Sequence, residues 1–167
     1  MPQDIKSIRC GVNELTSKIL IHPNPKTGLE AKFSLQYCLA VALSNRNVGV
    51  ENFEDEKVDS EDIRKIINKI EMYIHRELKE RNTISSAIID IETKGGKKYS
   101  CRIDKPSGSG RSPLTWERLV SKFKDCSSLV LNEEDSNSII TNIRDLERLS
   151  NIKKLMGTLS LGSKDHI

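Results

Sequence analysis

The sequence lacks the motifs that mark most catalytic centres. Its 167 residues are only 4% aromatic, and no two cysteines form a Cys-x-x-Cys pair. There is no Gly-x-Ser-x-Gly, no Walker A lysine, no His-Glu-x-x-His and no aspartate-rich metal loop. The glycine-containing loop at 108–110 lacks the strand and helix context of a phosphate site, so a surface hinge is its simpler interpretation. We therefore expect neither a metal nor a cofactor.

Long hydrophobic runs and one-sided charge are also missing. No stretch approaches the roughly 18 apolar residues that span a membrane, and the N-terminus does not resemble a signal peptide. The net charge is only +3, without a basic block interleaved with aromatics. Cys10, Cys38, Cys101 and Cys126 are scattered without a disulfide-like spacing, which favours a reducing compartment. These features predict a cytoplasmic protein with no membrane and no nucleic-acid partner.

What is present is organised around residues 25–43, a stretch that begins polar and basic and ends apolar. Thr27 followed by Glu30 predicts a helix N-cap with a capping box. The apolar residues that follow predict a helix buried nearly all round. The sequence thus predicts one core helix from Thr27 to about Ser44.

The start of this predicted helix is also a candidate anion site. A helix N-terminus offers unpaired N–H groups and partial positive charge, which suit a carboxylate or a phosphate. We expect Gly28 to leave the first turn open to a ligand, with lysine side chains beside it. The predicted substrate-binding residues are Lys26, Thr27, Gly28, Lys32 and Ser34. The ordinary alternative is that both lysines simply solvate the helix surface.

Two nearby residues are candidates for catalysis, although neither belongs to a complete catalytic constellation. His22 lies in the proline-containing loop before Thr27, where it is placed to donate a proton near neutral pH. An ordinary loop histidine is the competing interpretation, because no carboxylate accompanies it in the local sequence. Tyr37, like Ser34 and Gln36, is a polar residue in a buried helix and needs a hydrogen-bond partner. The alternative for Tyr37 is a bond across the core.

The remaining pattern indicates the fold class. The predicted strands cover residues 5–12, 71–76, 87–91 and 99–103, and the later helices begin at Asp59 or Ser60, at Thr115, near Asp135 and near Ile152. Gly95 and Gly96 predict a two-residue type I′ turn between the last two strands. This order does not alternate as a doubly wound parallel sheet does. We predict an α+β two-layer sandwich, a small, mainly antiparallel sheet with helices packed on it, forming one domain over 1–160 with a frayed tail over 161–167.

Residues 27–43 closely resemble the hallmark of the MmgE/PrpD family, which includes 2-methylcitrate dehydratase, cis-aconitate decarboxylase and iminodisuccinate epimerase. In this chain they read Thr-Gly-Leu-Glu-Ala-Lys-Phe-Ser-Leu-Gln-Tyr-Cys-Leu-Ala-Val-Ala-Leu. The resemblance continues through residues 48–53, 60–70, the hairpin, 112–123 and 146–159. It covers nearly the whole chain in the same order.

The resemblance implies that this chain is the smaller C-terminal lid domain, with a chorismate-mutase-like sandwich, of a cofactor-independent lyase or isomerase. Family substrates are small di- or tricarboxylates, and most catalytic side chains come from a helical N-terminal domain that this chain lacks. The implied function is that of a substrate-covering domain, 2-methylcitrate dehydratase-like and inactive alone, whose partner is the helical domain in cis or in trans. Some decarboxylases of the family carry a tyrosine in the loop before the hallmark, and this chain has Ile19 near the corresponding position. This departure favours a reaction other than decarboxylation. The alternative is a non-catalytic module that forms a homodimer or binds a partner through the surface left open.

Overall fold

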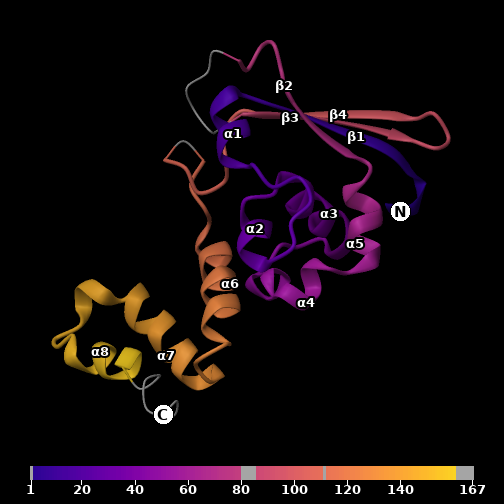
Figure 1. Ribbon diagram of the computed structural model, residues 1–167. Coiled ribbons are helices and arrows are strands. Elements are labelled where there is room, and N and C mark those ends of the chain that lie inside the picture. Colours follow the sequence, from indigo (N-terminus) through magenta and orange to yellow (C-terminus); the bar gives the residue numbers. More distant parts are fainter. Residues whose placement is uncertain (1, 80–85, 111, 161–167) are drawn as a thin grey trace. The chain divides into compact units, whose positions relative to one another are not determined.

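The computed structural model describes residues 2–79, 86–110 and 112–160, and these form two compact units that meet in sequence between Pro113 and Leu114 (Figure 1). The predicted frayed tail, 161–167, lies outside the described residues.

The first unit contains a four-stranded sheet in the order β2-β1-β3-β4. Its strands are β1 (Ile5–Val12), β2 (Ile70–Ile74), β3 (Ala87–Thr93) and β4 (Lys98–Ile103). β1 runs parallel to β2 and antiparallel to β3, and β3 and β4 form an antiparallel hairpin. The α+β prediction is confirmed, and the sheet is mixed, with the parallel pairing at one edge.

The turn of the hairpin differs from the predicted type I′ turn. The amide of Thr93 donates to the carbonyl of Lys97 at 2.9 Å, so three residues, Lys94, Gly95 and Gly96, form the loop. Among the described glycines of this loop only Gly96 has a positive φ, of 77°. A three-residue loop that ends in a left-handed residue is the next most common hairpin connection, and the two glycines alone do not distinguish it from type I′.

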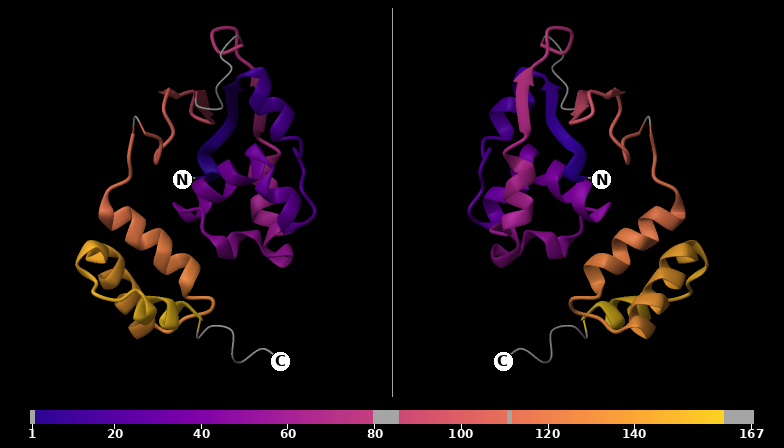
Figure 2. Two further views of the ribbon diagram at one scale, coloured as in Figure 1. Left: turned by 90° about the vertical axis from the view of Figure 1, so that its left-hand side faces the viewer. Right: turned by 90° about the vertical axis from the view of Figure 1, so that its right-hand side faces the viewer.

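Helices lie on one side of this sheet (Figures 1 and 2). In chain order they are η1 (Pro2–Asp4), α1 (Glu14–Ile19), α2 (Gly28–Lys32), α3 (Leu35–Asn45), η2 (Val50–Phe53), α4 (Asp55–Val58) and α5 (Glu61–Ile67). α3 and α5 contribute Tyr37, Val41 and Ile66 to a core that also contains Ile8 of β1 and Ile70 of β2. The predicted layer of helices on a sheet is therefore present, and it places α2 and its flanking loops at the surface of the core.

The predicted single core helix is in fact two helices, α2 and α3. Phe33 ends α2, and Ser34 takes an extended conformation (φ −119°, ψ 112°) as the N-cap of α3. The Ser34 hydroxyl accepts a hydrogen bond from the amide of Tyr37 at 3.1 Å. Serine competes for backbone groups in this way, which makes it a better cap than a mid-helix residue. The prediction of one continuous helix is wrong for this reason, although its start and its end near Ser44 are close to those observed.

The second unit consists of α6 (Trp116–Ser127), α7 (Glu133–Arg144), η3 (Leu146–Arg148) and α8 (Lys153–Ser160). Thr115 caps α6 by accepting from the amide of Arg118 at 3.4 Å, as predicted. Asn132 caps α7, which begins at Glu133, two residues before the expected start near Asp135. Apolar side chains of α6 and α7 line a cavity of about 250 Å³, and they are Trp116, Leu119, Val120, Phe123, Ile139, Ile140 and Ile143.

Candidate functional site

The predicted binding residues lie on and around the short helix α2. Thr27 is its N-cap and accepts from the amide of Glu30 at 3.3 Å. The Glu30 carboxylate reaches back and accepts from the amide of Lys26 at 2.7 Å. The predicted start of the helix is thus confirmed, with the returning carboxylate bonded one residue earlier than a standard capping box requires.

The first turn of α2 is closed, contrary to the prediction. The amide of Gly28 donates to Oδ1 of Asp55 at 2.6 Å. The carbonyl oxygen of Phe53 lies 1.8 Å from the position that a Cβ on Gly28 would take, so η2 and α4 pack directly on this glycine. The chain's own carboxylates, Glu30 and Asp55, therefore occupy the place that the sequence assigned to a ligand. Local sequence does not reveal this, because Asp55 is 27 residues away.

The two lysines lie at opposite ends of α2. Lys26 precedes the helix, whereas Lys32 is in its last turn, where a cation is favourable to the helix dipole. The expected crowding of both cations at the N-terminus is therefore wrong, because the helix is only five residues long. The amide of His22 donates to the carbonyl of Phe33 at 3.3 Å, which holds His22 beside the Lys32 end. Both lysines are exposed and His22 is half-buried.

Tyr37 and Ser34 are inside the core rather than on this surface. The Tyr37 hydroxyl donates to the carbonyl of Asn52, and its ring lies 5.8 Å from that of Phe53, centroid to centroid. Burial raises the pKa of the Tyr37 phenol, with a smaller contribution from Cys38. This geometry corresponds to the alternative interpretation of Tyr37, a bond across the core. Ser34, fully buried, serves as the cap of α3.

Gln36 is the one polar residue of the α3 start whose need for a partner is not met. Its side chain is 6% exposed, and its Oε1 has no hydrogen-bond partner among the described residues. An unpaired buried acceptor costs stability, so such groups often have a functional reason. The sequence indicated that Gln36 needs a partner, but it did not separate Gln36 from Ser34 and Tyr37.

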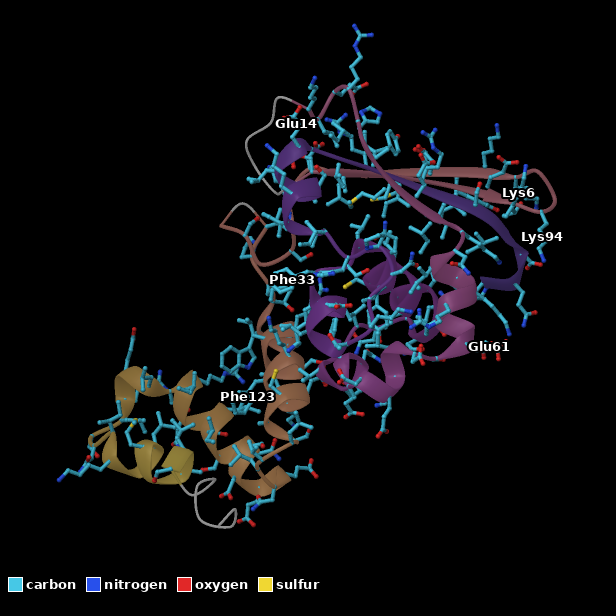
Figure 3. The ribbon with its side chains drawn as sticks, in the orientation of Figure 1. Lys6, Glu14, Phe33, Glu61, Lys94 and Phe123 are labelled. Carbon is cyan, nitrogen blue, oxygen red and sulfur yellow. The ribbon has the colours of Figure 1, made fainter. Side chains whose placement is uncertain are left out.

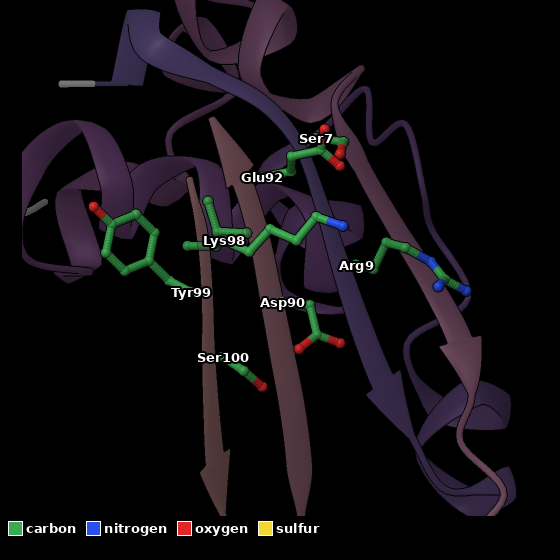
Figure 4. A pocket seen from close by; sticks show the side chains of 8 residues that line it. Ser7, Arg9, Asp90, Glu92, Lys98, Tyr99 and Ser100 are labelled. Atoms are coloured by element: carbon green, nitrogen blue, oxygen red, sulfur yellow. The ribbon is translucent and has the colours of Figure 1, made fainter. Parts of the chain in front are cut away.

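Two concave regions of the first unit were not predicted from the sequence. One, of about 430 Å³, lies on the polar face of the sheet and mixes cations with anions (Figure 4). Its polar lining residues are Ser7, Arg9, Asp90, Glu92, Lys98 and Ser100. Lys6 also pairs with Glu92 at 2.7 Å, so acidic and basic groups here neutralise one another. In the sequence, the polar residues that line this region alternate with apolar ones in three separate strands. That these polar residues share one surface follows only once the strand order is known.

The second region is a cleft of about 720 Å³ whose lining contains both basic and apolar residues. Arg46, Lys94 and Lys97 supply the cations, while Leu43 and Ile91 belong to its apolar lining. Lys94 lies on the hairpin loop, well separated in Figure 3 from Phe33 beside the α2 site. This cleft therefore offers a second cationic surface with which the α2 residues can be compared.

Comparison with known proteins identifies the class. The model of the MmgE/PrpD C-terminal domain matches residues 1–148, through the first unit and into the second. The chain belongs to the MmgE/PrpD family and carries its C-terminal domain. The resemblance drawn from residues 27–43 is thereby confirmed.

Curated relatives include three cis-aconitate decarboxylases. The human protein is 26% identical over 133 residues, which cover 80% of this chain and 28% of the relative. The mouse protein is 27% identical over the same length, covering 80% and 27%. The protein of Aspergillus terreus is 23% identical over 139 residues, covering 81% and 28%. The chain thus spans less than a third of the length of these relatives.

No helix in the described part of the chain is both long and apolar enough to cross a membrane. No group of three or more His, Cys, Asp or Glu side chains in that part of the chain is arranged to hold a metal ion.

Proposed function

We propose that this chain is the substrate-covering lid of an MmgE/PrpD-type lyase or isomerase that acts on small di- or tricarboxylates. The observation that carries this proposal is the family match over residues 1–148. The chain corresponds to 28% of the human relative, so the remaining part of such an enzyme is supplied by a helical N-terminal domain in cis or in trans. The lid is inactive without that domain, and the complete enzyme works in the cytoplasm.

The lid contributes charge to substrate binding, and the helical domain contributes the base. Loss or addition of water, carbon dioxide or a proton next to a carboxylate develops enolate-like charge, which nearby cations stabilise. Lys32, with His22 held beside it, is the part of the predicted site best placed to contact a carboxylate, because its side chain is exposed and lies away from the Asp55 carboxylate. Lys26 is exposed at the other end of the helix and completes the cationic surface.

The other predicted binding residues act by shaping this surface. Thr27 and Ser34 hold the starts of α2 and α3 through their hydroxyl caps. Gly28 lets η2 approach α2 closely. These roles fix the backbone from which Lys26 and Lys32 extend. Because Tyr37 is bonded to Asn52, its part is to hold that core in place rather than to transfer a proton.

Dehydration of a 2-methylcitrate-like substrate is the proposed reaction, and Ile19 is the residue that favours it over decarboxylation. The curated relatives are decarboxylases by name, so the experiment compares both reactions. The chain is mixed with the helical domain of a family member, and water loss from 2-methylcitrate and carbon dioxide release from cis-aconitate are measured. We expect no turnover from the chain alone and dehydration from the mixture.

Variants test the proposed contacts in the same assay. Lys32→Ala should raise KM more than it lowers kcat, because it removes binding charge rather than the base. Lys97→Ala, in the basic cleft, is the matched control that removes an exposed lysine elsewhere and should leave KM unchanged. A mixture that never forms a complex or never turns over either substrate would contradict the proposal. An equal effect of both variants would contradict the assignment of Lys32 alone.

A second candidate function is that of a non-catalytic partner-binding module. The observation in its favour is that Ile21, Leu29 and Phe33, all near α2, are 60%, 68% and 43% exposed. Exposed apolar side chains on one segment mark an interaction surface. Leu29→Ser should weaken binding of the helical domain if the lid proposal is correct. If the chain instead binds a different protein, and the helical domain does not compete for that binding, the partner-binding module would be favoured.

A further inference from the structure

β4 forms an open edge of the sheet. Within the part of the chain that the structure describes, it pairs with β3 and with no other strand (Figure 1). All six of its residues are exposed, including Tyr99 at 57% and Ile103 at 50%. An edge of this kind presents unpaired N–H and C=O groups that can join a strand from another chain.

The hydrogen-bond pattern identifies which backbone groups point outward. The bond from the amide of Thr93 to the carbonyl of Lys97 makes these two residues a hydrogen-bonded pair. Pairs alternate along an antiparallel ladder, so odd-numbered residues of β4 bond to β3. The N–H and C=O groups of Lys98, Ser100 and Arg102 therefore face away from the sheet.

We infer that β4 pairs with β4 of a second copy of this chain, antiparallel, with the two-fold axis at Cys101. This register makes Ser100 and Arg102 of the other copy a hydrogen-bonded pair, so the outward groups of both strands are used. It also sets Lys98 opposite Asp104 of the other copy. The two four-stranded sheets then form one continuous sheet. The inference concerns an interaction surface and does not depend on the reaction proposed above.

Charge selects this register over its neighbours. A shift by two residues in one direction sets Lys98 opposite Arg102, and a shift in the other direction sets Arg102 opposite itself. Like charges directly opposite each other destabilise a strand pair, whereas opposite charges stabilise it. In the inferred register Asp104, which bonds to Arg102 of its own chain at 3.1 Å, also gains a cation from the other copy.

The other face of the strand is also complementary in this register. Tyr99 lies opposite Ile103 of the second copy, so two exposed apolar side chains cover each other. Cys101 lies opposite Cys101 in a pair without hydrogen bonds, where Cα atoms are about 4.5 Å apart. That separation is within the range for a disulfide. Because Cys101 is free and exposed, it reports on the interface directly.

The test is cross-linking of the full chain by oxidised glutathione, together with sedimentation velocity under reducing conditions. Oxidised glutathione accepts two electrons and two protons from a pair of thiols and is released as two molecules of glutathione. We expect a disulfide-linked dimer that disappears in Cys101→Ser and persists in Cys126→Ser, in which the other exposed cysteine is removed. Under reducing conditions the wild-type chain should show a reversible dimer.

A charge reversal tests the register. Lys98→Glu should raise the dimer dissociation constant roughly tenfold, because it places two pairs of like charges across the axis. Lys98→Glu with Asp104→Lys should restore it, and Lys94→Glu on the hairpin loop should leave it unchanged. Circular dichroism shows whether each variant is folded, and the wild-type cross-link gives a result that does not rely on any charge variant. A chain that stays monomeric at its highest soluble concentration, or a dimer that does not cross-link at Cys101, would overturn the inference.

Discussion

Oδ1 of Asp55 accepts a 2.6 Å hydrogen bond from the amide of Gly28, across 27 residues of sequence. This bond joins the first residue of α4 to the first residue of α2. It places an internal carboxylate where a helix N-terminus attracts an anion. The positive charge that the α2 region exposes is therefore carried by side chains rather than by the amide of Gly28.

Replacing Gly28 with alanine should destabilise the first unit. The new Cβ would lie 1.8 Å from the carbonyl oxygen of Phe53, which is backbone and cannot rotate away. Overpacking of this kind costs about 1–3 kcal/mol, and the close backbone contact favours the upper end. Urea unfolding measures the change. Gly95→Ala is the control, because a Cβ there meets nothing within 4 Å, and an equal loss in both variants would contradict the prediction.

Replacing Asp55 with alanine should lower the free energy of unfolding by about 1 kcal/mol, because the amide of Gly28 loses its acceptor. It should leave citrate affinity, measured by calorimetry, unchanged if Lys32 and His22 are the carboxylate contacts. A rise in the affinity for citrate would show instead that the anion binds at the N-terminus of α2. Glu56→Ala, which removes an exposed carboxylate from the same helix, controls for the change in net charge.

Local sequence was sufficient for much of the fold and for little of the site. Thr27 and Thr115 predicted helix starts correctly because capping involves residues only three apart. Ser34 was misassigned because its apolar neighbours favoured a continuous helix while its own hydroxyl favoured a cap. Local sequence could not predict that the first turn of α2 is closed at Gly28. That closure depends on how η2 and α4 fold back onto α2.

Gln36→Met should maintain or raise the stability of the chain. The wild-type Oε1 is buried without a partner among the described residues, and an unsatisfied buried polar group costs about 1–3 kcal/mol. Methionine has a similar volume and no such requirement. Thermal unfolding measures the effect, with Gln3→Met at an exposed position as the control. A clear loss of stability in Gln36→Met would mean that the amide makes a stabilising contact.

The pH dependence of stability should reveal the buried thiol of Cys10. Burial raises the pKa of Cys10 to about 11 from the ordinary 9.0, and the nearby Asp90 adds to the shift. Between these two values the unfolded chain releases the thiol proton while the folded chain retains it. The unfolded state is then stabilised, so this contribution to stability is complete below pH 9 and is lost as the pH rises toward 11.

The whole loss should amount to about 3 kcal/mol, since the shift is about two pKa units and one unit corresponds to about 1.4 kcal/mol; about 2 kcal/mol of it should fall between pH 9 and 11. Urea unfolding of Cys10→Ala should show a smaller fall over the same range, even though its stability at neutral pH is reduced by the cavity. Cys101→Ala, which removes an exposed thiol instead, should show the same fall in stability as the wild type. This control separates the effect of Cys10 from the titration of lysines. Alkylation by iodoacetamide provides a second measure, because a protonated, buried thiol should react far more slowly than Cys101 or Cys126. Equal falls in both variants, or rapid alkylation of Cys10 in the native chain, would contradict the prediction.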